Sequence, residues 1–243
     1  MLKLGDCRQL IKDIDDSSID LILTDPPYVG VVKDKWDQTE IVDDALAKEL
    51  FRVLKPTGSI YIWCGVGEKS SSLFRWYPIF NKLFHFKDLI TWKKRRGIGM
   101  RKGWLYTREE IMWFVKDNKK FIWNKEHQYS QQPNQFKKGF NGHKVKPFKR
   151  IPNIWTDIPE TLTRKQKGTK HATPKPIPAL ERIILCHTKE NDTILDPFAG
   201  SASTLIAARN LNRNAIGFEL DAGQYKESIA NLTTLNKSNI SNK

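Results

Sequence analysis

The chain contains 243 residues, of which 39% are hydrophobic, and carries a formal charge of +14. Its longest uncharged apolar stretch, at 58–67, is far shorter than the roughly 20 residues that a membrane-spanning helix needs, and no secretory leader opens the sequence. Three scattered cysteines exclude a disulfide framework and a paired-cysteine metal site. We therefore expect a cytoplasmic protein with a full apolar core and no metal site.

The first 116 residues alternate between predicted strands and helices. In chain order, the patterns predict a strand at 2–5, a helix at 7–14, a buried strand at 19–24, a helix at 39–54 ended by 55–58, a strand at 59–64, a helix at 69–84 interrupted at Pro78, and strands at 87–92 and 110–115. The run at 19–24 is short, dense and rich in β-branched residues, and the prolines at 26 and 27 end it. These features favour a strand buried in a parallel sheet.

Periodicity fades between 116 and 170 and then returns. Proline, glycine, asparagine and lysine dominate the aperiodic stretch, which is typical of a functional insertion. Later patterns predict a helix at 177–186, a strand at 193–195, a helix at 202–211, a strand at 215–219 and a helix at 222–235. The whole predicts an α/β fold with a doubly wound, mostly parallel sheet, divided into a first half (1–116), a basic insert (117–170) and a second half (171–243).

The positive charge lies almost entirely in one internal segment. Residues 93–170 contain 21 Lys and Arg against 6 Asp and Glu, so the rest of the chain is nearly neutral. A concentrated basic block is typical of a polyanion partner, and a solvated basic loop is the alternative.

The tetrapeptide Asp25-Pro26-Pro27-Tyr28 follows the strand at 19–24, where an open α/β sheet places its ligands. An aromatic amino group is a poor nucleophile because its lone pair is delocalised into the ring. The Asp25 carboxylate and the Pro26 carbonyl, which the two prolines hold in place, can accept hydrogen bonds from the two N–H groups of such an amino group. These bonds favour a pyramidal nitrogen. Tyr28 offers a flat face for an extruded base. We therefore interpret Asp25, Pro26, Pro27 and Tyr28 as catalytic, with a simple strand-ending turn as the alternative.

A second motif, at 196–204, follows the predicted strand at 193–195 and opens a helix. Gly200 permits close approach of the backbone to a ligand, as in nucleotide-type cofactor loops. Glu219 ends the next predicted strand, where an acidic residue can accept both hydroxyls of a ribose. A nicotinamide oxidoreductase shares such a loop but has no use for the tetrapeptide at 25–28.

Taken together, the motifs resemble those of the β-class amino DNA methyltransferases, the permuted group in which the catalytic tetrapeptide precedes the cofactor loop. The shared order is Gly5-Asp6-Cys7, Asp25 to Tyr28, the basic insert, His171 to Pro176, Asp196 to Ala202, and Glu219. The resemblance implies an S-adenosylmethionine-dependent DNA methyltransferase that flips its target base and transfers the methyl group directly. A serine commonly replaces the first aspartate in cytosine enzymes of the family, so Asp25 favours adenine N6.

The resemblance also implies which residues bind the cofactor. They are Asp6, Cys7, Asp25, Thr173, Lys175, Asp196, Phe198, Gly200, Ser201, Ser203, Thr204 and Glu219, with Asp6 and Cys7 beside the adenine and Glu219 at the ribose. Two departures from the family pattern concern the same region: Ala172 and Pro174 replace the commoner proline and glutamine, and Ala202 replaces a second glycine. An alanine held at positive φ would be strained.

Double-stranded DNA is the implied partner, in a prokaryotic cell or a phage-infected host. Basic residues interleaved with aromatics suit phosphate neutralisation and base stacking, and 93–96 are expected to form a basic loop near the active site. The expected DNA contacts are Lys93, Lys94, Arg95, Arg96, Arg101, Lys102, Lys137 and Lys138. A homodimer and a cognate restriction endonuclease stay open as further partners. The alternative functions are cytosine-N4 methylation, RNA amino methylation and a non-catalytic DNA-binding subunit of the same fold.

Overall fold

The structure is a computed structural model. The structure describes residues 1–28, 40–67, 70–98, 102, 104–134, 146–160 and 174–240, without the side chains of 95–98 and 234–240. Among these residues, none of the helices combines the length and the apolarity that a bilayer crossing requires.

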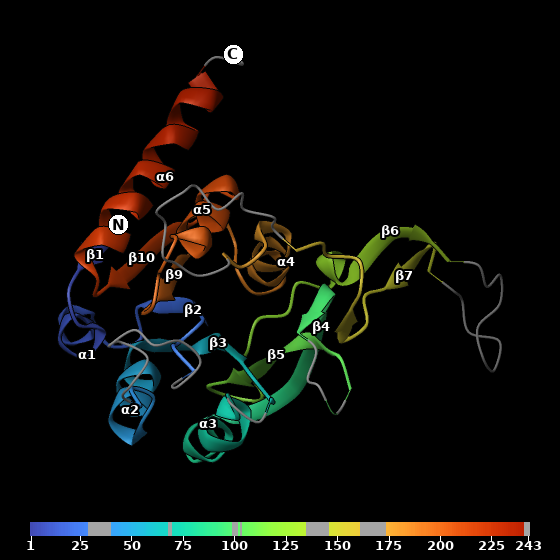
Figure 1. The fold of residues 1–243 in the computed structure, drawn as a ribbon, viewed down its shortest axis with the longest axis horizontal. Coiled ribbons are helices and arrows are strands. Elements are labelled where there is room, and N and C mark those ends of the chain that lie inside the picture. Colours follow the sequence, from blue (N-terminus) through green and yellow to red (C-terminus); the bar gives the residue numbers. More distant parts are fainter. Residues whose placement is uncertain are drawn as a thin grey trace.

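An eight-stranded sheet in the described residues forms the centre of the molecule (Figure 1). Its order is β1-β10-β9-β2-β3-β5-β4-β8, and β5 is the one described strand of this sheet that runs antiparallel to its neighbours. The strands are β1 (Leu2–Leu4), β2 (Ile19–Thr24), β3 (Leu54–Cys64), β4 (His85–Ile98), β5 (Tyr106–Val115), β8 (Ile154–Trp155), β9 (Thr193–Asp196) and β10 (Asn214–Glu219). The mostly parallel sheet confirms the predicted fold class.

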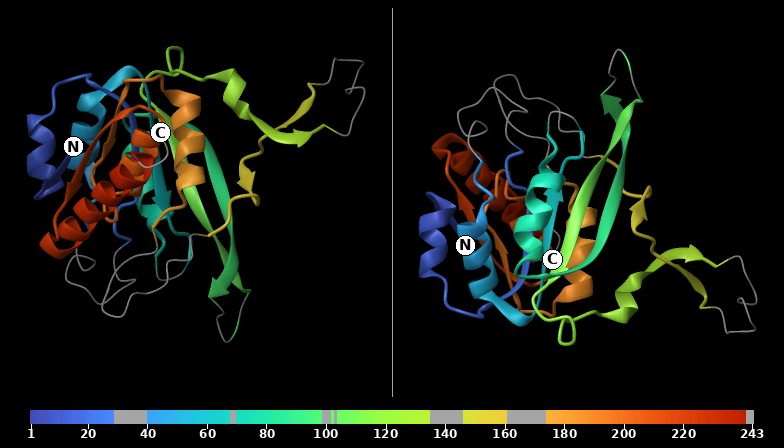
Figure 2. Two further views of the ribbon diagram at one scale, coloured as in Figure 1. Left: turned by 90° about the horizontal axis from the view of Figure 1, so that it is seen from above. Right: turned by 90° about the horizontal axis from the view of Figure 1, so that it is seen from below.

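Helices cover both faces of this sheet (Figure 2). One face packs against α1 (Cys7–Leu10), the short 3₁₀ helix at Ile11–Asp13, α2 (Asp44–Val53) and α3 (Ser72–Asn81). The other face packs against α4 (Ile177–His187), α5 (Ser203–Asn210) and α6 (Ala222–Ile240). Every residue of β2 is buried as a result, which explains why its sequence is apolar on both sides of the pleat.

The two ends of the chain meet in the sheet. β1 pairs in parallel with β10, with Leu2 opposite Gly217, and β2 pairs in parallel with β9, with Ile22 opposite Leu195. Neither half can bury both faces of its strands alone. The two halves therefore share one sheet, which brings the strand ends at Thr24 and Asp196 side by side.

Several predicted boundaries were wrong. α2 begins at Asp44, where the side chain of Asp43 accepts a hydrogen bond from the Leu46 N–H at 2.8 Å. β3 follows at once from Leu54, so residues 55–58 belong to a strand and not to a loop. Pro56 is tolerated there because the pairing with β2 is irregular at this point. α3 continues through Pro78 as far as Asn81, so the helix does not end at the proline.

The basic segment is also more ordered than its sequence indicates. The expected loop at 93–96 is wrong, because these residues continue β4 as far as Ile98. The insert contains the 3₁₀ helix η3 (Lys125–Gln128) and a small second sheet of β6 (Tyr129–Pro133) and β7 (Phe148–Arg150), which projects from the body (Figure 1). Its last strand, β8, pairs with β4 in the main sheet. The end of the insert is therefore built into the core.

Candidate active site

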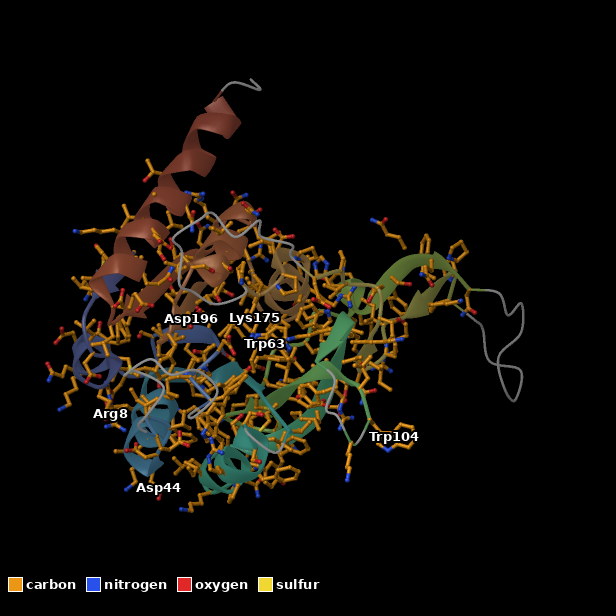
Figure 3. All side chains as sticks on the ribbon, viewed as in Figure 1. Arg8, Asp44, Trp63, Trp104, Lys175 and Asp196 are labelled. Atoms are coloured by element: carbon orange, nitrogen blue, oxygen red, sulfur yellow. The ribbon has the colours of Figure 1, made fainter. Side chains whose placement is uncertain are left out.

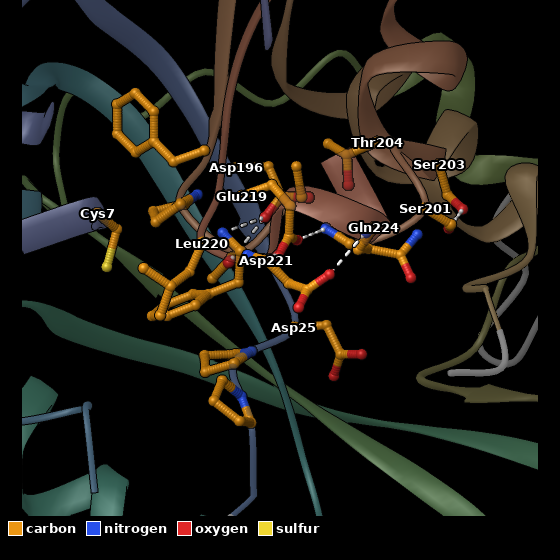
Figure 4. Close-up of a pocket in the computed structure, with 18 of the residues that line it drawn as sticks. Cys7, Asp25, Asp196, Ser201, Ser203, Thr204, Glu219, Leu220, Asp221 and Gln224 are labelled. Carbon is orange, nitrogen blue, oxygen red and sulfur yellow. Dashed lines mark hydrogen bonds between the residues drawn. The ribbon is translucent and has the colours of Figure 1, made fainter. Parts of the chain in front are cut away.

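A cavity of about 590 Å³ lies at the carboxyl ends of β2, β9 and β10. This is the point where the sheet order reverses, because the chain continues from β2 to β3 on one side and from β9 to β10 on the other. Figure 4 shows Asp25 and Glu219 facing the same space. The predicted residues that line it are Asp6, Cys7, Asp25, Pro26, Pro27, Tyr28, Lys175, Asp196, Phe198, Gly200, Ser201, Ser203, Thr204 and Glu219. Thr173 lies outside the described residues.

The loop after β9 is fixed by Asp196. Its Oδ1 accepts hydrogen bonds from the hydroxyl of Thr24 at 2.9 Å and from the Phe198 N–H at 3.1 Å, so it joins the ends of β2 and β9. Burial raises the pKa of Asp196 to about 6. The neighbouring motif therefore depends on a buried carboxyl group whose charge is disfavoured.

Two residues of this loop have positive φ. Gly200 has φ of 49°, which suits a glycine, and Ala202 has φ of 64° while fully buried. The strain foreseen for Ala202 is therefore present in the backbone, at the residue that caps α5.

Glu219 is held in place by the backbone around it. Its Oε2 accepts from the Gly200 N–H at 3.0 Å and its Oε1 accepts from the Asp221 N–H at 2.8 Å. Burial raises the pKa of this carboxyl group, against the effect of those hydrogen bonds. A carboxylate has about four lone-pair positions, so an oriented acceptor is still available to a ligand in the cavity.

Asp6 and Cys7 form the opposite end of the lining. Asp6 caps α1 by accepting from the Arg8 N–H at 2.8 Å. Cys7 is buried, and this burial raises the pKa of its thiol to about 12. The thiol is therefore neutral, and its surface in the cavity is apolar.

Both carboxylate oxygens of Asp25 have partners. Oδ1 accepts from the hydroxyl of Tyr28 at 2.8 Å, and Oδ2 lies 2.8 Å from the ammonium group of Lys175. Burial raises the pKa of Tyr28 well above its ordinary value, so the phenol stays a neutral donor. These contacts fix the orientation of the Asp25 carboxylate at the cavity wall.

Glu109 belongs to the same network but was missed by the sequence analysis. It lies on β5, only 12% of its side chain is exposed, and its Oε2 is 3.0 Å from the ammonium nitrogen of Lys175. Its other oxygen forms an ion pair with Lys94. Burial alone would raise the pKa of Glu109, but Lys175 and Lys94 together hold it below its ordinary value. Asp25 and Glu109 in turn outweigh the burial of Lys175 and raise its pKa, so this lysine keeps its charge.

Trp63 was also missed. Its side chain is 1% exposed and lines the cavity, and the Lys175 ammonium lies 5.1 Å from its ring centre. The indole N–H has no hydrogen-bond partner among the described residues. Neither residue had a sequence signal, because both reach the site from β3 and β5 through pairing between distant segments of the chain.

The predicted DNA contacts are only partly described. Lys93 on β4 and Lys102 are exposed, whereas Lys94 is 25% exposed and ion-paired with Glu109, which differs from the free phosphate contact expected of it. Arg101, Lys137, Lys138 and the side chains of Arg95 and Arg96 lie outside the described residues.

The fold and the cavity define a class, the doubly wound α/β proteins with a ligand site at the switch point, and solved structures of DNA methyltransferases share this fold. The structure titled "crystal structure of M1.HpyAVI-SAM complex" matches with a TM-score of 0.63 at 22% identity, covering 94% of this chain and 96% of the other. The PvuII DNA methyltransferase, described as cytosine-N4-specific, matches with a TM-score of 0.74 at 20% identity over 94% and 84% of the two chains. At these identities the likeness shows the fold.

Sequence relatives give the family. The chain is 32% identical to the type II methyltransferase M.BglII from Bacillus subtilis over 89% of its own length and 64% of the relative's. It is 30% identical to the DNA adenine methyltransferase YhdJ from Escherichia coli, over 94% of this chain and 81% of that protein. The N6/N4 family described as DNA methylase matches residues 19–231. The chain belongs to this DNA methylase family, which confirms the resemblance seen in its motifs. It spans about two thirds of the length of M.BglII.

Proposed function

We propose that the chain is an S-adenosylmethionine-dependent methyltransferase that modifies adenine N6 in double-stranded DNA after flipping the base. One observation carries the proposal: the Asp25 carboxylate and the Glu219–Gly200 loop line one cavity. A group that orients an amino nitrogen and a loop suited to a nucleoside thus face each other. The adenine-modifying relative YhdJ supports the choice of base.

The residues present fit the cofactor. Glu219 is an oriented acceptor for ribose hydroxyls, Cys7 and Phe198 offer apolar surface for an adenine ring, and Asp6, Ser201, Ser203 and Thr204 supply polar groups around the same space. When bound, S-adenosylmethionine supplies an electrophilic methyl group on a sulfonium centre. The family resemblance adds Thr173, and Lys175 lies at the edge of this set beside Asp25.

The protein's own residues prepare the acceptor. Asp25 and the carbonyl of Pro26 accept hydrogen bonds from the two N–H groups of the amino group, and the ring of Tyr28 stacks on the flipped base. The nitrogen becomes cationic as its bond to the methyl group forms, so a fixed carboxylate stabilises the transition state more than the ground state. Lys175 and Tyr28 hold that carboxylate in position before the base arrives.

The proposal extends to the surroundings of the site. The basic segment at 93–170 would contact DNA phosphates, and the target-recognition role falls to residues 117–170.

An enzyme of this kind works in the cytoplasm of a prokaryotic cell or on DNA in a phage-infected host. Relatives named type II methyltransferases support a cognate restriction endonuclease, and a homodimer is a further arrangement to test by sedimentation.

Mass spectrometry of nucleosides tests this proposal. Plasmid DNA from a host that lacks DNA methylases is incubated with the protein and S-adenosylmethionine. It is then digested to nucleosides and analysed, with the Asp25→Ala variant as the control. N6-methyladenine is the expected product, and the variant is expected to bind the cofactor but lose about two to three orders of magnitude in turnover. N4-methylcytosine alone would overturn the choice of base. A fully active Asp25→Ala protein would overturn the mechanism.

A further inference from the structure

The β4–β5 hairpin extends beyond the rest of the sheet (Figure 2). Pairing between β3 and β5 ends at Cys64 opposite Glu110. Pairing between β4 and β5 continues further, through Lys93 opposite Arg108 to Ile98 opposite Tyr106. Since Cys64 marks the carboxyl end of β3, the hairpin continues as a two-stranded ribbon past the edge where Asp25 lies.

The end of this ribbon carries an exposed apolar pair. Trp104 is 95% exposed and Leu105 is 59% exposed, and Figure 3 shows Trp104 directed away from the body of the protein. The other tryptophans of the described residues are buried or half-buried. An indole left in water forfeits the burial that normally stabilises it, so this pair is suited to contact a partner.

The charge around the pair selects the partner. Residues 93–108 contain seven Lys and Arg and no Asp or Glu, and the described cations Lys93, Lys102 and Arg108 are exposed. An apolar tip flanked only by positive charge complements a polyanion with an apolar interior. Duplex DNA has this composition, with phosphates outside and stacked bases inside.

The base of the ribbon is tied to the cavity. Lys94 forms an ion pair with Glu109, which contacts Lys175 and through it Asp25. The hydroxyl of Tyr106 accepts from the Val66 N–H at 3.4 Å, in the loop that follows β3. The position of the tip is therefore set relative to the residues that face the substrate.

We propose that Trp104, assisted by Leu105, is a wedge that enters the base stack of duplex DNA beside the target adenine. A two-stranded ribbon fits a DNA groove, and apolar side chains that insert between base steps hold the duplex open. Extruding a base loses its stacking and pairing, and the wedge offsets part of that loss by occupying the gap. The inference rests on the proposed function and adds the group that opens the duplex.

The test compares Trp104→Ala, Trp104→Phe and a control, Ile229→Ala, which removes a 39% exposed apolar side chain from α6. The methylated site is first mapped by sequencing a plasmid treated with the native protein, and short duplexes are made with the target adenine paired or mispaired. On the paired duplex, kcat/KM of Trp104→Ala is expected to fall about ten- to a hundredfold, since stacking on an aromatic side chain has effects of this size. Trp104→Phe and Ile229→Ala are expected to stay within about threefold of the native protein.

The mispaired duplex separates a wedge from an ordinary contact. A mispaired base is already easy to extrude, so Trp104→Ala is expected to regain most of its activity there, with unchanged binding of S-adenosylmethionine. Equal losses on both duplexes, or no loss on either, would overturn the wedge. A shift of Trp104→Ala to a smaller species in sedimentation, with normal activity, would assign the patch to self-association and overturn it as well.

A second measurement tests the wedge independently of the proposed methyltransferase activity. Insertion between base pairs unwinds closed circular DNA, and the unwinding is recorded when a nicked plasmid is sealed by ligase in the presence of the protein. The native protein is expected to lower the linking number and Trp104→Ala to leave it unchanged. This readout needs no methyl transfer, so a protein that fails to methylate but unwinds through Trp104 refutes only the proposed function. Equal unwinding by both proteins refutes the wedge.

Discussion

Glu109 shares the ammonium group of Lys175 with Asp25. Lys94 pairs with the other oxygen of Glu109, so the four side chains sum to zero charge, and Glu109 offsets part of the positive field that Lys175 exerts on Asp25. Glu109 does not line the cavity, so we assign it a positioning and electrostatic role exerted through Lys175.

Glu109→Gln is expected to lower kcat by about ten- to a hundredfold, less than the loss expected on removing a group in direct contact with the reacting atoms. KM for DNA and for S-adenosylmethionine should change by less than about threefold, and Glu109→Asp should restore part of kcat. Steady-state kinetics on plasmid DNA measures the split.

Glu110→Gln is the matched control for this change. Glu110 is the next residue on β5, is 1% exposed, and accepts from the hydroxyl of Thr91 at 2.6 Å rather than contacting Lys175. Its substitution is expected to affect stability and leave kcat nearly unchanged. Native kcat in a folded Glu109→Gln protein would contradict the assigned role.

Asp196 makes stability depend on pH in an unusual direction. Its pKa is raised from 3.8 to about 6 by burial, so between these values the folded protein holds a proton that the unfolded chain has lost. Stability contributed by this group is therefore complete below pH 3.8 and falls as the pH rises to about 6. A pKa difference of roughly two corresponds to about 3 kcal/mol, as an upper bound at neutral pH.

Asp196→Asn is accordingly expected to stabilise the protein by about 1–3 kcal/mol at pH 7.5 and by almost nothing near pH 4. The amide oxygen keeps the hydrogen bonds from Thr24 and Phe198. Urea unfolding at the two pH values, without cofactor, measures the effect, with the exposed Asp15→Asn as a control. A variant that is less stable at pH 7.5 would show that the ionised carboxylate is favoured after all.

The basic insert consists of two parts, of which one is independent of the core and the other is built into it. Tyr129 and Arg150 face each other at the base of the β6–β7 hairpin, so a short turn can replace everything between them. In contrast, Trp155 and Ile158 are 5% and 3% exposed in the core cluster below α4. The side chain of Asn124 also donates to the carbonyls of Leu185 and Thr188 at the end of α4.

Replacing residues 130–149 by an Asn-Gly turn is expected to preserve the fold and cofactor binding while weakening DNA binding. The segment contains five Lys and no Asp or Glu. Each lost phosphate contact reduces the slope of log affinity against log salt by about 0.9. Circular dichroism, calorimetry with S-adenosylmethionine and salt titrations of DNA binding make the test.

Deleting 117–170 as a whole is expected to unfold the protein, since truncating a buried tryptophan alone costs about 3–5 kcal/mol. A folded protein after that deletion would mean that β8 is dispensable. If replacing residues 130–149 leaves the slope of log affinity against log salt unchanged, the β6–β7 hairpin takes no part in DNA binding.

Across the molecule, the sequence was sufficient to predict an element wherever its local pattern and its tertiary environment agree. β2 is predicted residue for residue because both of its faces are buried, and the loop at 196–204 is recognisable because a strand, a glycine and a helix start follow one another. The fold class and the family follow from such elements, and both are confirmed. The roles of the individual site residues stay predictions.

The features that the sequence did not predict depend on pairing between distant segments of the chain. β8 has two residues, too few to show any period, and is defined only by its place beside β4. Glu109 becomes significant because Lys175, 66 positions later, reaches it across the sheet. Lys93 to Arg96 look like a loop because charge and glycine suggest solvent, whereas pairing with β5 keeps Lys93 extended.

The closure of the sheet by both ends of the chain has a consequence for biosynthesis. β1 and β2 leave the ribosome first, yet their neighbours β10 and β9 follow about 170 to 215 residues later. At roughly 5–20 residues per second, the apolar edge of β2 waits on the order of ten seconds or more for a partner. Nascent chains arrested before residue 193 are expected to be digested readily by protease, and chains extended past residue 219 to resist it. The cavity is incomplete until β9 and β10 have been synthesised, so the capacity to bind cofactor arises abruptly, when these strands join β1 and β2.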